Sequence, residues 1–270
     1  MKKIILTIAI LLLAVSLTNC KEKEQDDRPT FTVGMECAYA PFNWTEMFET
    51  ETNYPIDGTK LYAEGYDVQI AKKIADELGC RLVIKAIDWD GLITALSTGK
   101  IDAIIAGMSN TEERRVNVDF TAPYYRSTHV LVMANDSKYI NGKTLSDFAG
   151  ANVVGQVETL YDSLIDQLEG VNHLTPLADV TTIITAISTK RADITILEEP
   201  VAKGVIKTNP RLTYIKLTSG FNVSDEDVCV AIALRKGESE LNEKISQILA
   251  SITEEERSRL MDEAIAKNAE

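Results

Sequence analysis

Apolar positions in the first half of the chain follow two periodicities. In residues 65–79 (GYDVQIAKKIADELG) they recur every three to four positions, which predicts one buried face of a helix. Asp67 is a candidate N-cap and Gly79 a candidate terminator. Segments that are apolar throughout predict strands buried on both faces at 29–36, 81–87 and 101–107, with a second helix over 90–100.

The same alternation returns after residue 136. Strands are expected at 151–156, within 171–179, at 192–199 and at 227–237, and helices over 159–170, 180–191 and 200–210, with two helices at the C-terminal end. In each half a helix ends in STGK or STKR before an Asp-containing strand. This internal repeat predicts an α/β protein of two similar lobes, each a mainly parallel sheet flanked by helices.

The expected division of the chain follows from this repeat. Lobe 1 is expected to comprise residues 30–131 and 227–270, and lobe 2 residues 132–226. Hinge strands near 128–136 and 222–229 are expected to carry the chain between the two lobes.

Residues 1–20 have the layout of a secretory signal peptide, with two lysines, an apolar run and a polar end. The apolar run is shorter than the roughly 20 residues of a membrane span. Cys20 follows LTN in a pattern that resembles a lipobox, whose lipid-modified cysteine anchors a protein to a membrane, although Asn19 departs from the small residues usual there. Ordinary secretion is the alternative. Residues 21–29 are charged and predict a flexible tether.

Composition limits the classes of function. The apolar fraction of 45% suffices for a sizeable core. The net charge of −13 argues against nucleic acid as a partner, because no basic stripe is present to neutralise phosphates. Besides Cys20 the chain has Cys37, Cys80 and Cys229, without Cys-x-x-Cys spacing. No metal or cofactor is expected, and a Cys37–Cys80 disulfide and buried free thiols both stay open.

Residues 107–125 (GMSNTEERRVNVDFTAPYY) carry the clearest candidate site. They follow the apolar strand at 101–107, and open α/β sheets bind ligands at the carboxyl ends of their strands. Ser109 or Thr111 can cap a helix start whose free N–H groups would lie beside Arg114. A guanidinium and N–H groups together suit a planar carboxylate, so this segment predicts an anion site.

Several motifs, in order along the chain, resemble those of the family 3 extracellular solute-binding proteins, the polar amino acid receptors of ABC transporters. They are FTVGMECAYAPFNW, GYDVQIAKKIA, WDGLITALSTGKIDAIIAGMS, the segment at 107–125, and DITILEEPVA. The resemblance covers essentially the whole chain after the signal peptide. It implies a two-lobe, type II periplasmic-binding-protein fold that closes on its ligand by a hinge motion.

The resemblance implies roles for residues of the first lobe. Arg114 matches the arginine whose fork of N–H groups holds the α-carboxylate of the ligand, whereas Arg115 is expected on the surface. Ser109 and Thr111 match positions that offer hydroxyl and N–H groups to that carboxylate and to the ligand amine. Gly107 matches a position whose carbonyl accepts from the α-ammonium.

From the second lobe, Glu198 matches an acidic position that pairs with the α-ammonium, and Glu199 could compete for this role. Thr159 matches a carboxylate contact in a turn where the family often has Gly-Thr. Residues 157–158 are Val and Glu here, so the glycine is missing. Gln156 is expected to line the same wall.

Recognition of the ligand side chain is expected from aromatic residues at the same edge. Tyr39, Phe42 and Trp89 come just after the first two strands, and such rings hold aliphatic or cationic groups by burial and cation–π attraction. Each could instead pack in the core. Glu36 precedes Tyr39 by three residues, and a carboxylate in the pocket wall would reject acidic ligands. Lysine or arginine is therefore favoured over glutamate, and glutamine stays open.

Together these residues predict a monomeric receptor that captures a free L-amino acid between its lobes and delivers it to the membrane subunits of an ABC permease. It is expected on the periplasmic or extracytoplasmic face of a membrane, held there by lipid, and it is not expected to be an enzyme. A ligand-binding module for signalling and a cyclic-acid dehydratase on the same fold are the alternatives. Neither histidine, His129 or His173, falls in a binding motif. Residues 45–64 exceed the common family spacing and predict a surface loop near the mouth of the cleft.

Overall fold

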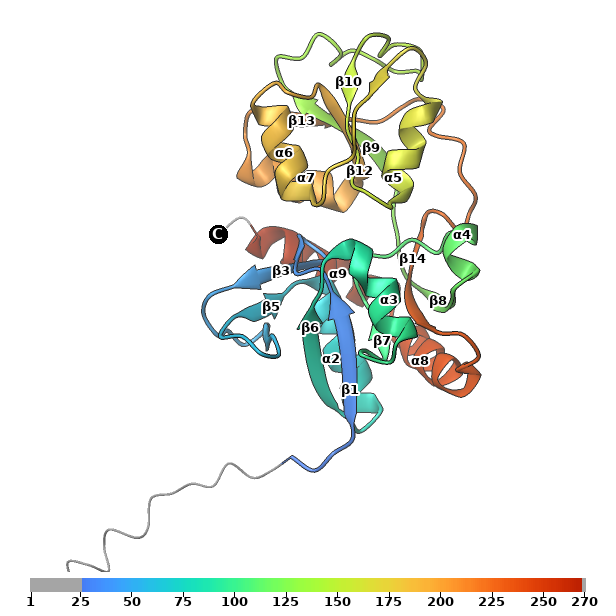
Figure 1. Ribbon diagram of the computed structural model, residues 1–270. Helices are drawn as coiled ribbons and strands as arrows, with labels where there is room; N and C mark the ends of the chain where they lie inside the picture. Colours follow the sequence, from blue (N-terminus) through green and yellow to red (C-terminus); the bar gives the residue numbers. More distant parts are fainter. Residues whose placement is uncertain (1–25, 269–270) are drawn as a thin grey trace, which may run out of the picture.

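The computed structural model describes residues 26–268, which form two lobes stacked one above the other (Figure 1). Each lobe is built on its own five-stranded sheet. The expected signal peptide, Cys20 and the start of the tether lie outside the described residues. Within residues 26–268, no helix has the length and apolar character needed to cross a membrane.

The sheet of lobe 1 has the strand order β6-β1-β7-β14-β8. β1 pairs in parallel with β6 and β7, as the continuously apolar segments predicted, whereas β14 runs antiparallel to both β7 and β8. The strand expected at 101–107 is reduced to two residues. These strands are β1 (Thr30–Met35), β6 (Arg81–Ala86), β7 (Ala103–Ile104), β8 (Val118–Arg126) and β14 (Cys229–Arg235).

The sheet of lobe 2 has the strand order β11-β10-β12-β9-β13. β10 is parallel to β11 and β12, and β9 is antiparallel to β12 and β13, so this sheet is also mixed. The apolar pattern did not predict β13. The strands are β9 (His129–Ala134), β10 (Asn152–Val153), β11 (Asn172–His173), β12 (Ile194–Glu198) and β13 (Leu212–Ile215).

The chain crosses between the lobes twice. Because β9 pairs with strands of lobe 2 from its first residue, the first crossing lies at residues 127–128, slightly before the expected boundary at 131. The second crossing lies between β13 and β14. The two crossings run side by side, since the N–H of Ser127 donates to the carbonyl of Val228 at 3.0 Å. These paired segments form the connection about which the lobes can move.

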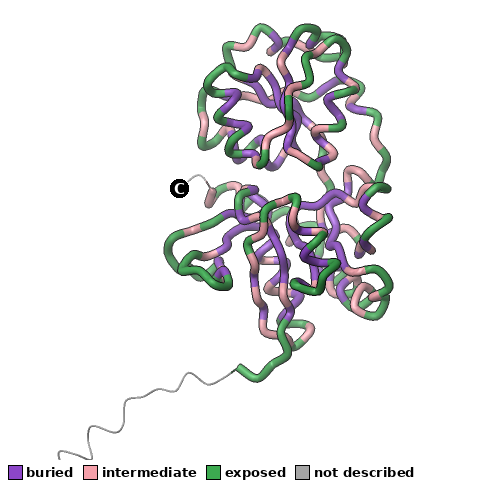
Figure 2. Tube along the Cα trace, in the orientation of Figure 1, coloured by how far each residue is buried: buried purple, intermediate pink, exposed green. Residues whose placement is uncertain are grey.

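Helices flank both sheets and leave the strands as the buried core, which Figure 2 shows in purple. All the helices expected from apolar spacing are present, although α3 and α5 are shorter than predicted. Lobe 1 carries α2 (Tyr66–Glu77), η1 (Trp89–Gly91), α3 (Leu92–Ser97), α4 (Glu112–Arg115), α8 (Ser239–Ser251) and α9 (Glu254–Lys267), and lobe 2 carries α5 (Leu160–Leu164), η2 (Ile165–Gln167), α6 (Val180–Ser188) and α7 (Glu199–Thr208).

The ends of α2 show one wrong and one confirmed prediction. Asp67 is not the N-cap: Gly65 occupies that position, and Asp67 lies in the first turn. Its buried carboxylate accepts hydrogen bonds from the hydroxyl of Tyr124 at 2.6 Å and the amide of Asn43 at 2.8 Å. Gly79 ends the helix with a left-handed φ of 66°, as glycine does in this position. The carboxylate thus fixes two neighbouring segments instead of a helix end.

Residues 38–64 form a small third sheet on lobe 1, with the order β2-β3-β5-β4. Its strands are β2 (Ala38–Tyr39), β3 (Asn43–Glu46), β4 (Tyr54–Pro55) and β5 (Tyr62–Glu64). The segment 45–64 is therefore not a plain surface loop. Its buried Glu64 forms an ion pair with Lys267 at the end of α9, at 2.6 Å. This pair ties the small sheet to the C-terminal helix.

The three described cysteines are free thiols, so the disulfide between Cys37 and Cys80 is not formed in this structure. Cys37 and Cys229 are buried, and burial raises the pKa of the Cys37 thiol to about 12. Such a thiol stays protonated and behaves as a small apolar side chain.

Candidate functional site

A small cavity lies between the lobes where the strands of both sheets end. Eight of the residues expected from the sequence line it, together with Leu160 and Tyr161. Its volume is about 10 Å³, which is about the room of one water molecule. The lobes are therefore closed on each other. The expected residues that line the cavity are Glu36, Tyr39, Trp89, Gly107, Ser109, Arg114, Gln156 and Thr159.

Arg114 projects from α4, a single helical turn that Thr111 caps by accepting the backbone N–H of Arg114. The side chain of Arg114 is buried, and its guanidinium lies 5.0 Å from the ring centroid of Trp89. It donates to the carbonyl of Ser109 at 2.9 Å and to the carbonyl of Glu158 at 3.1 Å. Burial lowers the pKa of Arg114, but an arginine stays charged in a protein. The site therefore has a fixed positive charge without a carboxylate partner among the described salt bridges.

The turn at Glu158 contacts lobe 1 directly. Its carbonyl accepts from the guanidinium of Arg114 and from Nε1 of Trp89, at 3.1 Å and 3.2 Å. Glu158 has a left-handed φ of 57°, a conformation that favours glycine. Thr159 follows as the N-cap of α5 and donates to the carbonyl of Gln156 at 2.7 Å. The turn therefore forms with Glu158 in place of the glycine usual in the family, and the carbonyl of Glu158 accepts a hydrogen bond from Arg114.

Glu198 provides a buried carboxylate at the end of β12. It is 1% exposed and accepts a hydrogen bond from the hydroxyl of Tyr39 in lobe 1, while its second oxygen, Oε1, has no partner. Desolvation by burial raises the pKa of Glu198 to about 8. A carboxylate held in this way gains most from a cation brought to its free oxygen. Glu198 does not itself line the closed cavity, because Tyr39 lies between.

Glu199 follows Glu198 as the first residue of α7. It forms ion pairs with Lys203 at 3.1 Å and Lys216 at 2.7 Å. Burial opposes the shift, but hydrogen bonds from Lys216 and Lys203 lower the pKa of Glu199 to about 2. Its charge is already satisfied by these lysines, so Glu198 is the carboxylate available to a ligand.

Glu36 and Gln156 form a second polar contact across the cleft. The amide of Gln156 in lobe 2 donates to the carboxylate of Glu36 in lobe 1 and to the carbonyl of Ala178, each at 3.0 Å. Burial raises the pKa of Glu36 to about 7, despite the opposing hydrogen bond from Gln156. Glu36 therefore lines the cavity without a cationic partner among the described salt bridges.

Besides Glu198, two expected residues do not line the cavity. Phe42 is buried behind Tyr39, with parallel rings 5.6 Å apart, and so supports the wall from the core. Thr111 lies outside the cavity as the cap of α4. Gly107 lines the cavity with a φ of 61°, and a side chain there would meet the ring of Tyr39 at 2.9 Å. Close packing against Tyr39 thus requires glycine at this position.

Tyr161 is the main residue that the sequence analysis missed. Its hydroxyl lies 3.5 Å from the hydroxyl of Ser109, and its ring contacts His129 edge to face. Burial raises the pKa of Tyr161 to about 12. Its place in the first turn of the helix capped by Thr159 was the available signal, because this turn faces the cleft.

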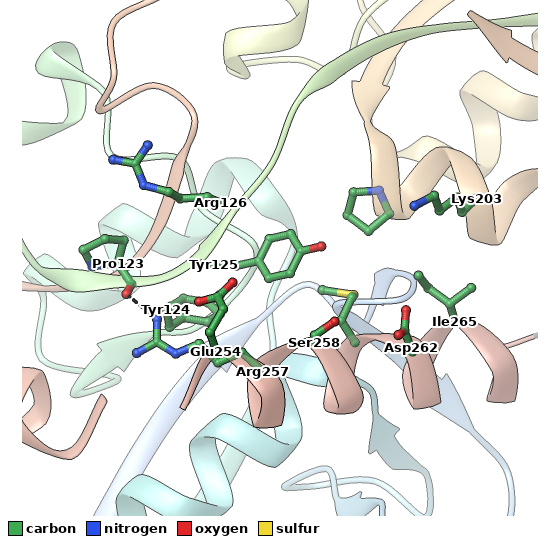
Figure 3. Close-up of a pocket in the computed structure, with 12 residues that line it drawn as sticks. Pro123, Tyr124, Tyr125, Arg126, Lys203, Glu254, Arg257, Ser258, Asp262 and Ile265 are labelled. Carbon is green, nitrogen blue, oxygen red and sulfur yellow. Dashed lines mark hydrogen bonds between the residues drawn. The ribbon is translucent and has the colours of Figure 1, made fainter. Parts of the chain in front are cut away.

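A larger groove of about 330 Å³ lies elsewhere between the lobes, along α9, β8 and α7 (Figure 3). Figure 3 shows Lys203 of lobe 2 and Asp262 of α9 on opposite sides of it. Next to it, Lys207 of α7 donates to the carbonyl of Ala266 at the end of α9. None of the expected ligand-binding residues lines this groove, so it is a contact zone of the lobes and not the candidate site.

Comparison with known protein families matches residues 31–265 to the bacterial extracellular solute-binding proteins, family 3. The chain belongs to this family. The family resemblance and the two-lobe type II fold expected from the sequence are thereby confirmed, and family membership places the protein outside the cytoplasm.

Individual relatives of this family 3 protein span most of its length. The arginine-binding extracellular protein ArtP of Bacillus subtilis is 29% identical over 260 residues, covering 92% of each chain. A probable histidine-binding protein of Campylobacter jejuni is 27% identical over 220 residues, covering 78% of this chain and 80% of the relative. The structure of the substrate-binding protein AbpA of Streptococcus pneumoniae, bound to L-arginine, superposes with a TM-score of 0.76 at 28% identity, covering 89% and 96% of the chains.

Proposed function

We propose that this family 3 protein captures a free amino acid with a cationic side chain and delivers it to an ABC permease. The observation that carries the proposal is a buried guanidinium on one lobe and a buried carboxyl group on the other. Within residues 26–268, the guanidinium of Arg114 in lobe 1 donates only to carbonyl groups, and Oε1 of Glu198 in lobe 2 has no hydrogen-bond partner. A zwitterion supplies what both lack, a carboxylate for Arg114 and an ammonium for Glu198.

The contacts across the cleft support a hinge mechanism. Tyr39 with Glu198, Glu36 with Gln156, and Arg114 with the carbonyl of Glu158 hold the closed form together. A cavity of about 10 Å³ cannot hold an amino acid, so the lobes must separate about residues 127–128 before a ligand enters. The ligand then replaces these contacts with its own and shifts the population toward a closed, occupied form.

The preference for a cationic side chain rests on Glu36. Its carboxylate is half-buried in the cavity wall, and its only described hydrogen-bond partner is the amide of Gln156. Ionised Glu36 would pair with a guanidinium or ammonium and would repel the carboxylate of glutamate. The relatives described above bind arginine or, by name, histidine, which supports the same class of ligand.

A calorimetric titration tests the proposal directly. The chain from Lys21 onward contains every residue of both lobes and is titrated with the twenty common amino acids. We expect arginine or lysine to bind with a dissociation constant near micromolar, about −8 kcal/mol, and Arg114→Ala to abolish the heat. Tight binding of a neutral amino acid instead would remove the role of Glu36. Absence of heat from every amino acid would refute the receptor proposal.

The membrane attachment of the receptor belongs to the same proposal. Cys20 is the lipidation site that we propose, and the receptor is proposed to act as a monomer. Mass spectrometry of the chain from its native membrane tests the first claim, because an acylated N-terminal cysteine has a distinct mass. A soluble chain with an unmodified N-terminus would support ordinary secretion.

A further inference from the structure

A buried carboxylate in lobe 1 lies behind the residues that line the cavity. Asp67, in the first turn of α2, is fully buried and is not itself a lining residue. Burial raises the pKa of Asp67 to about 6, although hydrogen bonds from Tyr124 and Asn43 oppose the shift. At neutral pH the group is therefore largely ionised. A buried charge is costly unless donors compensate it, so what these two donors hold in turn decides what the carboxylate does.

The first donor connects Asp67 to the backbone of Gly107. Tyr124 of β8 is fully buried, and its hydroxyl donates to the carboxylate at 2.6 Å. The same hydroxyl accepts the N–H of Gly107 at 3.2 Å. Gly107 lines the cavity with a left-handed φ of 61° and has no side chain that could anchor it. Its backbone orientation therefore depends on the hydroxyl of Tyr124, which the carboxylate fixes.

The second donor connects Asp67 to the turn after β1. The amide of Asn43 donates to the carboxylate at 2.8 Å, and its oxygen accepts the N–H of Cys37 at 2.7 Å. Cys37 has a left-handed φ of 57°, a conformation that a residue with a side chain keeps only where its surroundings hold it. The cavity-lining residues Glu36 and Tyr39 lie on either side of this turn.

Both branches end at the same edge of the sheet. β1 and β7 are adjacent parallel strands, so the segments that follow them leave the sheet side by side. Glu36 follows β1 directly, and Gly107 follows β7 by three positions. A single carboxylate on α2 is thus bonded, through one side chain each, to the two strand-end segments that form the lobe 1 wall of the cavity.

We infer that Asp67 is a positioning residue of the ligand site. Through Tyr124 and Asn43 it holds Gly107 and the turn at Cys37 in the arrangement that the ligand meets. This inference rests on the proposed receptor function. Asp67 touches no ligand; it raises affinity because groups that are already ordered need not be ordered by binding.

Calorimetry on Tyr124→Phe tests the first branch. The variant removes the hydroxyl between Asp67 and Gly107, and we expect the dissociation constant for arginine to rise about tenfold, because binding must then also order the backbone at Gly107. Tyr66→Phe is the matched control: its hydroxyl is equally buried and donates to the carbonyl of Tyr124 at 2.8 Å. Denaturant unfolding should show similar losses of stability, whereas Tyr66→Phe should keep the dissociation constant within about twofold. Equal losses of affinity in the two variants would overturn the inference.

An exchange of side chains tests the second branch. In Asp67→Asn the new amide would turn its N–H groups toward those of Asn43, and we expect about tenfold weaker binding of arginine. Adding Asn43→Asp restores every bond: the carboxylate at position 43 accepts from Cys37 and from the amide at position 67, whose oxygen still accepts from Tyr124. Affinity should return to within about threefold of the unaltered protein. A folded double variant that binds as weakly as Asp67→Asn would overturn the inference.

Hydrogen exchange of the Gly107 amide, followed by NMR without any amino acid present, gives a result that does not depend on the ligand. Exchange should be about tenfold faster or more in Tyr124→Phe than in Tyr66→Phe, because only the first variant removes the acceptor of this N–H. Equal rates in the two variants would refute the positioning role. Because this measurement needs no ligand, it stands even if calorimetry refutes the receptor proposal.

Discussion

The hydroxyl of Tyr39 in lobe 1 donates a hydrogen bond to the carboxylate of Glu198 in lobe 2, although the two residues lie 159 positions apart in the chain. This contact joins the two lobes across the cleft. It uses one oxygen of Glu198 and leaves the other without a partner. A ligand ammonium reaching that oxygen would convert a weak closing contact into an ion pair.

Glu198→Gln should weaken binding of the amino acid about tenfold to a hundredfold, because a hydrogen bond to a charged partner contributes about 1.5–3 kcal/mol. Glu199→Gln is the matched control, since Glu199 pairs with Lys203 and Lys216 outside the cavity. Its dissociation constant should stay within about twofold of the unaltered protein. Calorimetric titration measures both. Equal losses in the two variants would show that Glu198 has no special contact with the ligand.

Arg114→Lys should lower affinity about tenfold or more, because lysine keeps the charge but loses the planar fork that binds a carboxylate with two bonds. It would also lose the stacking on Trp89 and one of the carbonyl contacts. Arg115→Lys, on the same helical turn but bonded to Asn110, is the control. Tight binding by Arg114→Lys would mean that a point charge suffices and that the fork is not used.

Glu36→Gln should change specificity more than affinity for the backbone of the ligand. We expect arginine and lysine to bind about tenfold more weakly, because the variant lacks the carboxylate that would pair with their side-chain cation. Glutamine should keep or gain affinity, because the neutral amide at position 36 does not require a cation. Competition between labelled arginine and unlabelled glutamine gives the ratio in one experiment. The prediction fails if the ratio for the variant equals that for the unaltered protein.

The ligand-free protein should become less stable as the pH rises from about 5 to about 8. Burial raises the pKa of Glu198 to about 8 and of Glu36 to about 7, against about 4.3 in an unfolded chain. Between these values the folded state binds more protons than the unfolded state, so the free energy of unfolding falls with pH. Below this window both states are protonated and no stability is lost.

Denaturant unfolding at a series of pH values checks this dependence. The Glu36→Gln/Glu198→Gln variant should show a flatter profile than the unaltered protein. Some slope should remain, because burial also raises the pKa of Asp67 to about 6. A variant profile as steep as that of the unaltered protein would assign the pH dependence to other groups.

Gly65→Ala should destabilise lobe 1 strongly. Gly65 has a φ of 126°, and a Cβ there would lie 2.4 Å from the backbone oxygen of Phe42. We expect a loss of about 3 kcal/mol or more, and a Tm lower by about 6 °C or more. Gly58→Ala is the control: its φ is 73°, but no atom lies near its Cβ, so only the backbone term of about 1–2 kcal/mol applies. Similar losses in both variants would rule out the clash.

Local patterns along the chain predicted most of the elements that build the lobes. The apolar runs of β1 and β6 and the spacing in α2 report burial of their own residues, so they can be read without the rest of the fold. Asp67 was misassigned because a carboxylate at a helix start resembles a cap, whereas here it bonds to Tyr124 and Asn43. The apolar pattern did not predict β13, because the burial of this strand depends on its pairing with β9, which is far away in the chain.

For the site, the sequence by itself determined the kinds of group available and their places at strand ends, including Arg114, Trp89 and Glu198. Only the tertiary structure decided which of them meet. Glu199 has two lysine partners and Glu198 has none among the described residues, which distinguishes the two neighbouring carboxylates. Phe42 packs behind Tyr39, and Tyr161 lines the cavity. Contacts between lobes depend on how two separate sheets are joined at residues 127–128, and no local pattern of apolar and polar residues records that geometry.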